Sequence, residues 1–384
     1  MNILFVNLFT SYTGNAIAKG FEELGHKCIQ IYLYTPEELY SDSKIDGLIL
    51  DNVEKYSPDI IFSINFWPPI ARIANLKHLK YISYGYDSPQ NLPGIRDMEY
   101  ETNYIFLFDK EETGEYKKLG IDRVYHLSLA TDIKHWNSIR RVSAVKYDIS
   151  LVGRIYESTF PMLINSMDDY LKGYFNAIIS AQQRLYGYYI IDELIDEKLL
   201  QGCNYCFRKK DDRADVSKRQ LSYSIGSYIT HLDRIMLLRL LSRVGSAHLF
   251  TFDLTGEQKN MLEGVNIHKS VSYEEEMPNI FRSSKINLCP ILRTIKSGIP
   301  QRALDIMACG GFLLSSFQPE LFDIFGADEE LVLYESYEDA MEKAKFYLSH
   351  DDIRKRIAEN GYAKVEKYFS YEKKLAEMLK IAGE

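Results

Sequence analysis

The first part of the chain alternates short apolar runs with longer stretches that have the spacing of amphipathic helices. Each apolar run is shorter than a typical helix and has the composition of a buried strand. The runs lie at 2–6, 28–33, 59–63, 81–84, 104–108 and 124–127, and a polar loop at 10–15 precedes a helix that ends at Leu24. Strands separated by helices pair in parallel, so we predict a doubly wound α/β unit with ligands beyond the carboxyl ends of its strands.

A second alternation of the same kind follows. Its strands are expected at 147–154, 247–252, 265–268, 285–289, 312–315 and 331–334, with a helical insertion at about 160–243 after the first of them. We therefore predict two α/β domains in tandem, 1–140 and 147–350, joined by a polar linker near 136–146. The helical pattern from 351 to 384 forms a C-terminal helix pair, which could cross back onto the first domain.

Length and charge narrow the function classes. The 384 residues exceed what one hydrophobic core usually covers, and 46% hydrophobic with 26% charged residues is ordinary for a globular protein. The net charge of -8 opposes nucleic acid or anionic lipid as the main partner. The 29 tyrosines are explained by half-buried rings whose hydroxyls reach solvent, and a few of them could instead stack on sugars.

The five cysteines are scattered and odd in number, which favours reduced thiols and a cytoplasmic protein. Cys203 and Cys206 have the spacing of half a zinc site, but no second half completes it, so we expect no metal there. The apolar run at 2–6 is too short to span a membrane and lacks the basic leader of a signal peptide, so we expect no transmembrane segment.

The segment 297–311, SGIPQRALDIMACGG, contains the candidate chemistry. Pro300 suits the first turn of a helix and Gly310 its end, and the residues between them are mostly apolar. The start of this helix, at Gly298, Ile299, Pro300 and Gln301, predicts an anion site. Arg302 could grip a phosphate and Asp305 could accept both hydroxyls of a ribose, or the two could form an ion pair across one helical turn.

The segments around this helix resemble a known family. Residues 279–288 before it and 319–321 after it are similar to the donor-binding half of glycosyltransferases with the two-domain GT-B fold, and most similar to the CgeB-like group named for spore-maturation proteins. Residues 351–361, 86–89, 148–153 and the insertion ending near Arg234 extend the resemblance over nearly the whole chain. It implies two Rossmann-like domains that face a cleft, with the acceptor in the first and a nucleotide-sugar donor in the second.

The resemblance assigns roles where residues match. Many GT-B enzymes have two glutamates separated by seven residues, and the second of them binds the ribose of the donor. Here Ser297 occupies the first place and Asp305 the second. Asp305 keeps the ribose-binding chemistry with one methylene fewer, whereas Ser297 offers no carboxylate to stabilise charge on the transferring sugar.

The diphosphate is expected at Arg154, which follows Gly153 as the cation of the family does. A lysine commonly follows in related enzymes, but this chain has Ser158 and Thr159, so phosphate neutralisation falls on Arg154, Arg302 and the helix start. The resemblance therefore implies transfer without a metal ion and without a further cofactor. Tyr273 either stacks on the base, uracil in the UDP-sugar that we expect, or covers the start of a helix at 274–281.

In the first domain Asp87 is the candidate general base of an inverting transfer, because it follows a central strand. The alternative is a turn, since Asp before Ser-Pro commonly begins one. Thr13, Gly14 and Asn15, in the first loop, are expected at the acceptor or sugar, and His126 and His135 are weaker candidates.

We thus predict a cytoplasmic glycosyltransferase that moves a sugar from a nucleotide-diphosphate sugar to a hydroxyl of a glycan, a protein or another acceptor. A non-catalytic nucleotide-sugar-binding protein and a nucleotide-sugar 2-epimerase on the same fold are the alternatives, while glucosylation of DNA bases is disfavoured by the charge.

Overall fold

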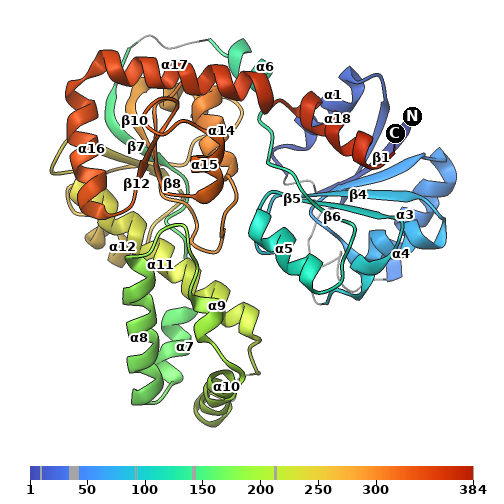
Figure 1. Ribbon diagram of the computed structural model, residues 1–384, viewed down its shortest axis with the longest axis horizontal. Coiled ribbons are helices and arrows are strands. Elements are labelled where there is room, and N and C mark those ends of the chain that lie inside the picture. The colour runs from blue at the N-terminus through green and yellow to red at the C-terminus, as the bar shows by residue number, and fades with distance from the viewer. Residues whose placement is uncertain are drawn as a thin grey trace. The chain divides into compact units, whose positions relative to one another are not determined.

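The computed structural model describes residues 1–8, 11–33, 43–90, 92, 94–140, 144–211 and 214–383. The chain forms two compact units. The first comprises Met1–His135 together with Lys364–Glu384, and the second comprises Trp136–Ala363. Each unit is built around its own parallel six-stranded sheet with helices on its faces (Figure 1). The predicted fold class of two Rossmann-like units with a helical insertion and C-terminal helices is therefore confirmed.

The sheet of the first unit has the strand order β2-β1-β3-β4-β5-β6. Val6 of β1 lies opposite Ser63 of β3, so the loops that leave these two strands begin at the same edge. The strands are β1 (Asn2–Leu8), β2 (Lys27–Leu33), β3 (Ile60–Ile64), β4 (Lys80–Gly85), β5 (Asn103–Leu107) and β6 (Val124–His126). The helices are α1 (Gly14–Glu23), α3 (Ser43–Tyr56), α4 (Pro68–Leu76), the 3-10 helix η1 (Arg96–Glu99), α5 (Lys110–Lys118) and α6 (Ile133–Ser138), which continues into the second unit.

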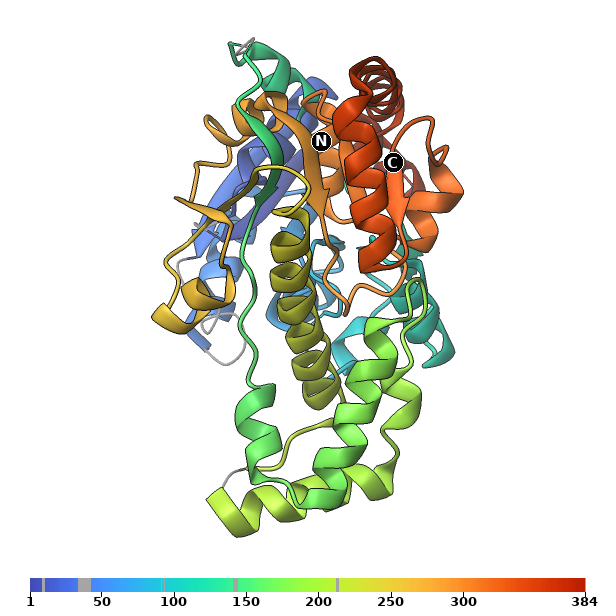
Figure 2. The ribbon, with the colours of Figure 1, turned by 90° about the vertical axis from the view of Figure 1, so that its left-hand side faces the viewer.

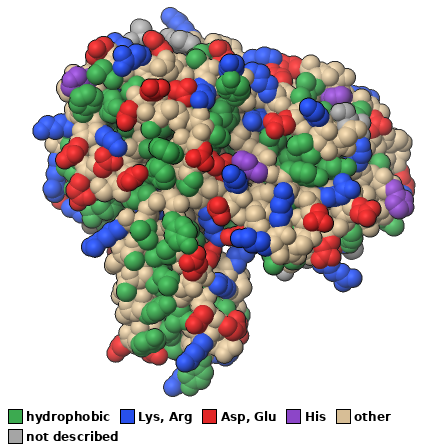
Figure 3. Space-filling view, viewed as in Figure 1, with side chains coloured by type: hydrophobic (Ala, Val, Ile, Leu, Met, Phe, Trp, Pro, Cys, Tyr) green, Lys and Arg blue, Asp and Glu red, His purple; other side chains and the backbone are tan. Residues whose placement is uncertain are grey.

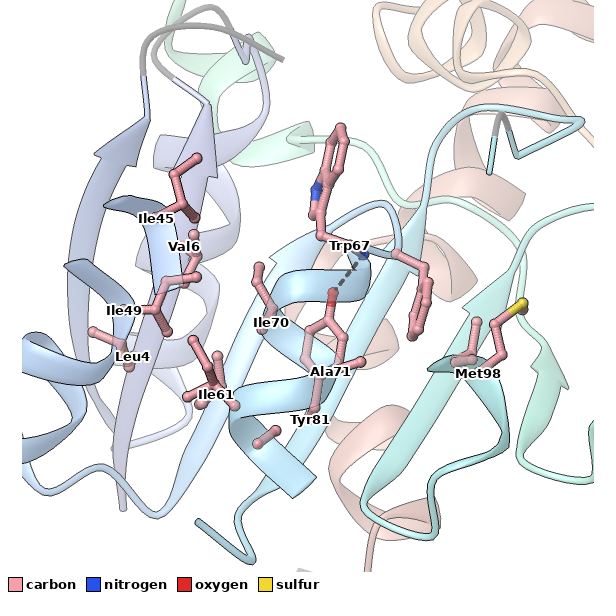
Figure 4. Close-up of a cluster of buried hydrophobic side chains, with 14 of the residues drawn as sticks. Leu4, Val6, Ile45, Ile49, Ile61, Trp67, Ile70, Ala71, Tyr81 and Met98 are labelled. Atoms are coloured by element: carbon pink, nitrogen blue, oxygen red, sulfur yellow. Dashed lines mark hydrogen bonds between the residues drawn. The ribbon is translucent and has the colours of Figure 1, made fainter. Parts of the chain in front are cut away.

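A buried tyrosine joins a helix to the core of this sheet. Tyr81 of β4 is fully buried, and its hydroxyl accepts a hydrogen bond of 3.0 Å from the backbone N–H of Trp67, the residue before α4 (Figure 4). The same hydroxyl lies 2.6 Å from the hydroxyl of Ser63 on β3. Since buried polar groups are costly without partners, these bonds fix where α4 begins relative to the two strands.

The sheet of the second unit has the order β12-β11-β10-β7-β8-β9. Its strand order reverses between β7 and β10, and open α/β sheets bind ligands at that crevice. The strands are β7 (Tyr147–Val152), β8 (Ala247–Thr251), β9 (Asn266–Lys269), β10 (Ser284–Cys289), β11 (Leu313–Ser316) and β12 (Val332–Tyr334). The helices that flank them are α12 (Gly256–Met261), α13 (Met277–Ser283), α14 (Gln301–Ala308), α15 (Pro319–Ile324) and α16 (Tyr337–Ser349).

The helical insertion has a core of its own. It contains α7 (Phe160–Ser166), α8 (Asp169–Gln183), α9 (Ile191–Leu194), α10 (Glu197–Asp211) and α11 (Lys218–Leu241). Leu221, Ile225 and Ile229 of α11 are buried in the insertion, whereas Leu238 and Leu241 are buried against the sheet. Figure 2 shows this helix, in olive, running from the insertion to the sheet.

The chain ends in α17 (Asp351–Tyr368) and α18 (Tyr371–Ile381). Helix α18 packs on α1, where a side chain at Gly20 would lie 2.8 Å from the Leu375 side chain. Lys134 forms ion pairs with Glu23 of α1 and Glu372 of α18, and these raise the pKa of Lys134. The last helix is thus part of the first unit. Within the described ranges of the chain, no helix is both long and apolar enough to span a membrane.

Candidate functional site

The carboxyl ends of β7 and β10 lie side by side in the second unit. Asn287 pairs with Ser150, so the two strands end level with each other. Gly153 and Arg154 follow β7, and Pro290 follows β10. The loop after β10 leads to α14, whose N terminus consequently lies at this edge. We call this region the donor edge.

Helix α14 begins one residue later than the sequence suggested. Pro300 has extended backbone angles of φ −71° and ψ 148° and is the N-cap, so Gln301 is the first helical residue. Gly310, with φ +76°, follows the helix end as predicted. Gly298 and Ile299 are buried, so the accessible start of the helix is formed by half-buried Pro300, Gln301 and Arg302.

Asp305 is fully buried, and its carboxylate bonds a residue of its own helix and one of the segment before α13. Its Oδ1 accepts hydrogen bonds from Gln301 Nε2 at 2.9 Å and from the Tyr273 hydroxyl at 3.2 Å. The Tyr273 ring packs edge-on against the buried Trp136, with ring centroids 5.2 Å apart. The structure therefore brings the predicted ribose and base residues together. Trp136, placed by the sequence in a linker, is instead fully buried against Tyr273. Residues 141–143 of that linker lie outside the described residues.

The helix predicted at 274–281 begins later, at Met277. Ser272 and Glu276 close a turn before it: the Glu276 carboxylate accepts from the Ser272 N–H at 2.8 Å, and the Ser272 hydroxyl accepts from the Glu276 N–H at 3.2 Å. These reciprocal bonds hold residues 273–276 as a turn, and the tyrosine is presented from that turn instead of from a helix.

Arg302 has different partners from Asp305. Its guanidinium contacts the Met277 sulfur and lies 5.7 Å from the centre of the Phe281 ring. The Arg302–Asp305 ion pair, one of the two alternatives open from the sequence, is therefore not what organises this helix. Within the described part of the chain Arg302 has no carboxylate partner.

Arg154 lies at the same edge. It is exposed, and its guanidinium stacks 4.8 Å from the centre of the Phe252 ring, which follows β8. Ser158 and Thr159, at the place where related enzymes commonly carry a lysine, attach α7 to α11. The Ser158 hydroxyl donates to the Ser224 carbonyl at 2.6 Å, and the Thr159 and Ser224 hydroxyls are 2.9 Å apart. Ser158 and Thr159 thus hold the start of α7 against α11 within the insertion.

Ser297 is buried, and a carboxylate lies beside it. Its hydroxyl donates a hydrogen bond of 2.8 Å to Glu320 of α15, and the Glu320 N–H donates to the Ser297 carbonyl at 3.2 Å. Glu320 is 3% exposed. Glu320 was not among the predicted site residues, because only the fold brings it to Ser297; the Pro-Glu-Leu segment after a strand was its one visible signal in the sequence.

Arg234 was also missed as a site residue. It donates through Nη1 to the Arg154 carbonyl and through Nη2 to the Pro290 carbonyl, the second at 2.8 Å. Burial raises the pKa of the Cys289 thiol to about 11, while the charges of Arg234 and Arg302 lower it. Both arginines thus lie near Cys289, the last residue of β10.

In the first unit, the predicted acceptor residues lie at the carboxyl ends of β1 and β4. Thr13 is buried before α1, and Gly14 and Asn15 form the first turn of that helix, two residues earlier than the sequence analysis placed it. A side chain at Gly14 would lie 2.0 Å from Asn7 Nδ2, so a larger residue here would have to displace the Asn7 side chain. Asn15 is exposed.

Asp87 follows β4 and is held by Asn65, which follows β3. Asn65 has φ +59°, and its Nδ2 donates to Asp87 Oδ2 at 2.7 Å. Its Oδ1 accepts from the backbone N–H of Tyr86 at 2.7 Å and of Asp87 at 3.2 Å. Burial raises the pKa of Asp87 above its usual value, and the bond from Asn65 offsets part of that rise. The carboxylate is therefore directed by the side chain of Asn65, which follows the neighbouring strand β3, and not by the turn after Asp87.

The two histidines are elsewhere in this unit. His126 ends β6, and His135 lies in α6, where its N–H donates to Asp132 at 3.0 Å. Over the ranges that the structure describes, no cluster of three or more His, Cys, Asp or Glu residues could hold a metal ion.

Residues 234–380 match the sequence model of the glycosyl transferase-like family. No curated protein matches the chain by sequence. Among solved structures, a glycosyltransferase from Rickettsia africae has a TM-score of 0.62 at 13% identity, over 99% of this chain and 97% of that one. Sucrose-phosphate synthase from Thermosynechococcus elongatus has 0.60 at 9% identity, over 99% and 98%. Anabaena HepE in complex with UDP and glucose has 0.57 at 11% identity, over 99% of both chains. These likenesses show the GT-B fold.

Proposed function

We propose that this protein, a glycosyltransferase with the GT-B fold, takes its sugar from a UDP-sugar bound at the donor edge and transfers it to a hydroxyl of a glycan or protein. The transferase assignment stands on the family match over residues 234–380 and on the fold. The donor, the residues and the CgeB-like subgroup are the proposal, and the complex of a structural neighbour with UDP and glucose supports the choice of donor.

One observation carries the donor assignment. Three arginines at the donor edge, Arg154, Arg234 and Arg302, have no carboxylate partner in the described part of the chain. Arginines at one edge of a sheet that are not paired with carboxylates favour a bound anion with several oxygens, for which the arginine fork is well suited. The buried Asp305 lies in the helix that starts at this edge and supplies the complementary acceptor for ribose hydroxyls.

In the proposed reaction the acceptor oxygen attacks the anomeric carbon, and the bond from that carbon to the diphosphate oxygen breaks. Negative charge then develops on the leaving diphosphate, where Arg154 and Arg302 stabilise it. We propose that these cations make a divalent metal unnecessary. Activity that survives a chelator would support this, and activity that a chelator abolishes and Mg²⁺ restores would contradict it.

We assign the acceptor to the first unit. Asp87 accepts the proton of the attacking hydroxyl in an inverting transfer, and Thr13, Gly14 and Asn15 lie along the acceptor. The net charge of -8 supports a partner other than nucleic acid, and on the face drawn in Figure 3 red and blue side chains are interleaved. The five free thiols support a cytoplasmic location.

A non-catalytic nucleotide-sugar-binding protein is the second candidate, because a hydroxyl at Ser297 replaces the carboxylate of many relatives. UDP-sugar binding without hydrolysis or transfer over a panel of acceptors would favour it. Formation of an epimer from a labelled donor without acceptor would instead favour a 2-epimerase.

Calorimetric titration with UDP tests the donor edge. Arg302→Ala and Asp305→Ala should each weaken UDP binding by about 10- to 100-fold, because each removes charge-assisted hydrogen bonds. Asp323→Ala, an exposed acid on α15, is the control that should bind as the unaltered protein does. Unchanged UDP affinity in folded Arg302→Ala and Asp305→Ala variants would overturn the proposal.

A further inference from the structure

Arg234 connects the insertion to the donor edge. It lies in the part of α11 that packs on the sheet, and its two Nη atoms donate to the carbonyls of Arg154 and Pro290. Those carbonyls belong to the turns after β7 and β10, the two strands at which the sheet order reverses. The guanidinium also stacks 4.7 Å from the centre of the Tyr156 ring. Arg234 therefore bridges the two turns that border the proposed diphosphate site.

The turn after β7 is shaped around this guanidinium. Gly153 has φ +150° and Tyr156 has φ +55°, which are uncommon conformations that cluster at binding sites. A side chain at Gly153 would lie 3.5 Å from Arg234 Nη1, so the arginine lies against the glycine backbone. The backbone of the turn after β7 thus passes close to the Arg234 guanidinium, with Gly153 and Tyr156 in these uncommon conformations.

The guanidinium keeps unused hydrogen-bonding capacity. An arginine has five N–H donors, and the two carbonyls take two of them. Nε of Arg234 is buried and has no hydrogen-bond partner among the described residues. Carbonyl groups satisfy donors without neutralising the charge, so the site retains a net positive charge that an anion would compensate.

A purely structural arginine in the same region looks different. Arg293 is paired with Asp233, the residue before Arg234, at 2.7 Å between Nε and Oδ2. Their side chains are 9% and 6% exposed. The acid next to Arg234 in sequence therefore neutralises another arginine, although both cations attach α11 to the loop after β10. The ion pair with Asp233 neutralises Arg293, so a structural role is enough to explain that residue. The charge of Arg234 is not neutralised by its carbonyl partners and has no such explanation.

We propose that Arg234 is a diphosphate-binding residue of the donor edge, supplied by the helix that ends the insertion. This rests on the proposed function, because it assigns the ligand of that same site. Arg234 adds a third cation to Arg154 and Arg302. This chain has Ser158 and Thr159 where related enzymes commonly carry a lysine, so that lysine charge is missing here. The insertion consequently contributes to donor binding through α11.

The test compares ligands with and without phosphates. UDP is titrated by calorimetry and uridine by ligand-observed NMR, using the full chain with Arg234→Ala, Arg234→Lys or Arg239→Ala. Arg239 is an exposed arginine on the same helix and serves as the control. We expect UDP affinity to fall about 10- to 100-fold in Arg234→Ala, with uridine affinity and that of the control unchanged. Arg234→Lys should recover part of the loss, since it keeps the charge without the fork.

Two results would overturn the inference. One is unchanged UDP affinity in Arg234→Ala while Arg302→Ala loses it, which would leave the proposed function standing without Arg234. The other is an equal loss for UDP and uridine, which would show that Arg234 only maintains the shape of the site. Absence of UDP binding to the unaltered protein would instead refute the proposed function, and the inference with it.

Discussion

The attachment of the insertion depends on a buried ion pair whose loss should be costly. Arg293 donates through Nε to Asp233 at 2.7 Å and through Nη1 to the Leu185 carbonyl at 2.7 Å. The other carboxylate oxygen of Asp233 accepts from the Tyr337 hydroxyl at 2.6 Å. Burial alone would lower the pKa of Arg293, but the interaction with Asp233 outweighs it and the pKa is raised. The pair joins α11, the loop after β10 and the start of α16.

Substitution of Arg293 by alanine leaves Asp233 buried with only the tyrosine as donor and removes the donor to Leu185. Breaking a buried ion pair by removing one partner typically costs about 3–5 kcal/mol. In a unit of this size each kcal/mol lowers Tm by about 2–4 °C, so the melting transition of the second unit should fall by about 6–20 °C. Arg184→Ala removes an exposed arginine from the adjoining end of α8 and should leave Tm unchanged.

Scanning calorimetry of the two single variants and the double variant measures the effect. Asp233→Ala should destabilise the second unit by a similar amount, because it leaves the Arg293 guanidinium buried without its carboxylate partner. The double variant should lose less than the sum of the singles, since groups in direct contact are energetically coupled. Losses below about 1 kcal/mol in both singles, or strictly additive losses in the double variant, would refute the assignment of this pair as a buried and coupled contact.

Two predictions concern pH. Asn65→Ala removes the donor that lowers the pKa of Asp87, so that pKa rises and the acidic limb of the kcat/KM profile should move to higher pH; an acidic limb at its original pH would contradict the role of Asn65. Burial lowers the pKa of both His248 and His268, whose rings share a hydrogen bond of 2.9 Å, so the folded state favours their neutral forms. Their contribution to stability is therefore present above the unfolded pKa of about 6.5 and lost as pH falls through the folded value. Replacing His268 by glutamine should flatten the decline in Tm between about pH 7 and 5, and identical slopes would exclude the pair as its source.

The strands of both sheets could be predicted from the sequence because their apolar runs are continuous. Buried parallel strands leave little room for polar residues, as residues 3–6 of β1 and all of β12 illustrate. Helix starts were less predictable. The positions at which α1, α13 and α14 begin depend on turn hydrogen bonds and on backbone angles at their caps, to which the spacing of apolar residues is insensitive.

The site could be predicted only where residues are close in sequence. Gln301 and Asp305 are one helical turn apart, and their hydrogen bond follows from helix geometry. The contacts of Tyr273 with Asp305 and of Ser297 with Glu320 join residues of different loops and helices, and no local pattern indicates them. Arg234 was hidden for the same reason, since its partners Arg154 and Pro290 follow two different strands.

The shared helix α11 also limits how the insertion can be removed or exchanged. A chimera that replaces residues 160–216 would expose Leu221, Ile225 and Ile229, the face that α11 buries in the insertion. A chimera that replaces α11 as well would instead remove Leu238 and Leu241, which pack on the sheet, together with Arg234. A workable graft would therefore keep α11 of this chain and supply new helices whose apolar surface matches its existing face. Homologous insertions of different length should be exchangeable only under that condition.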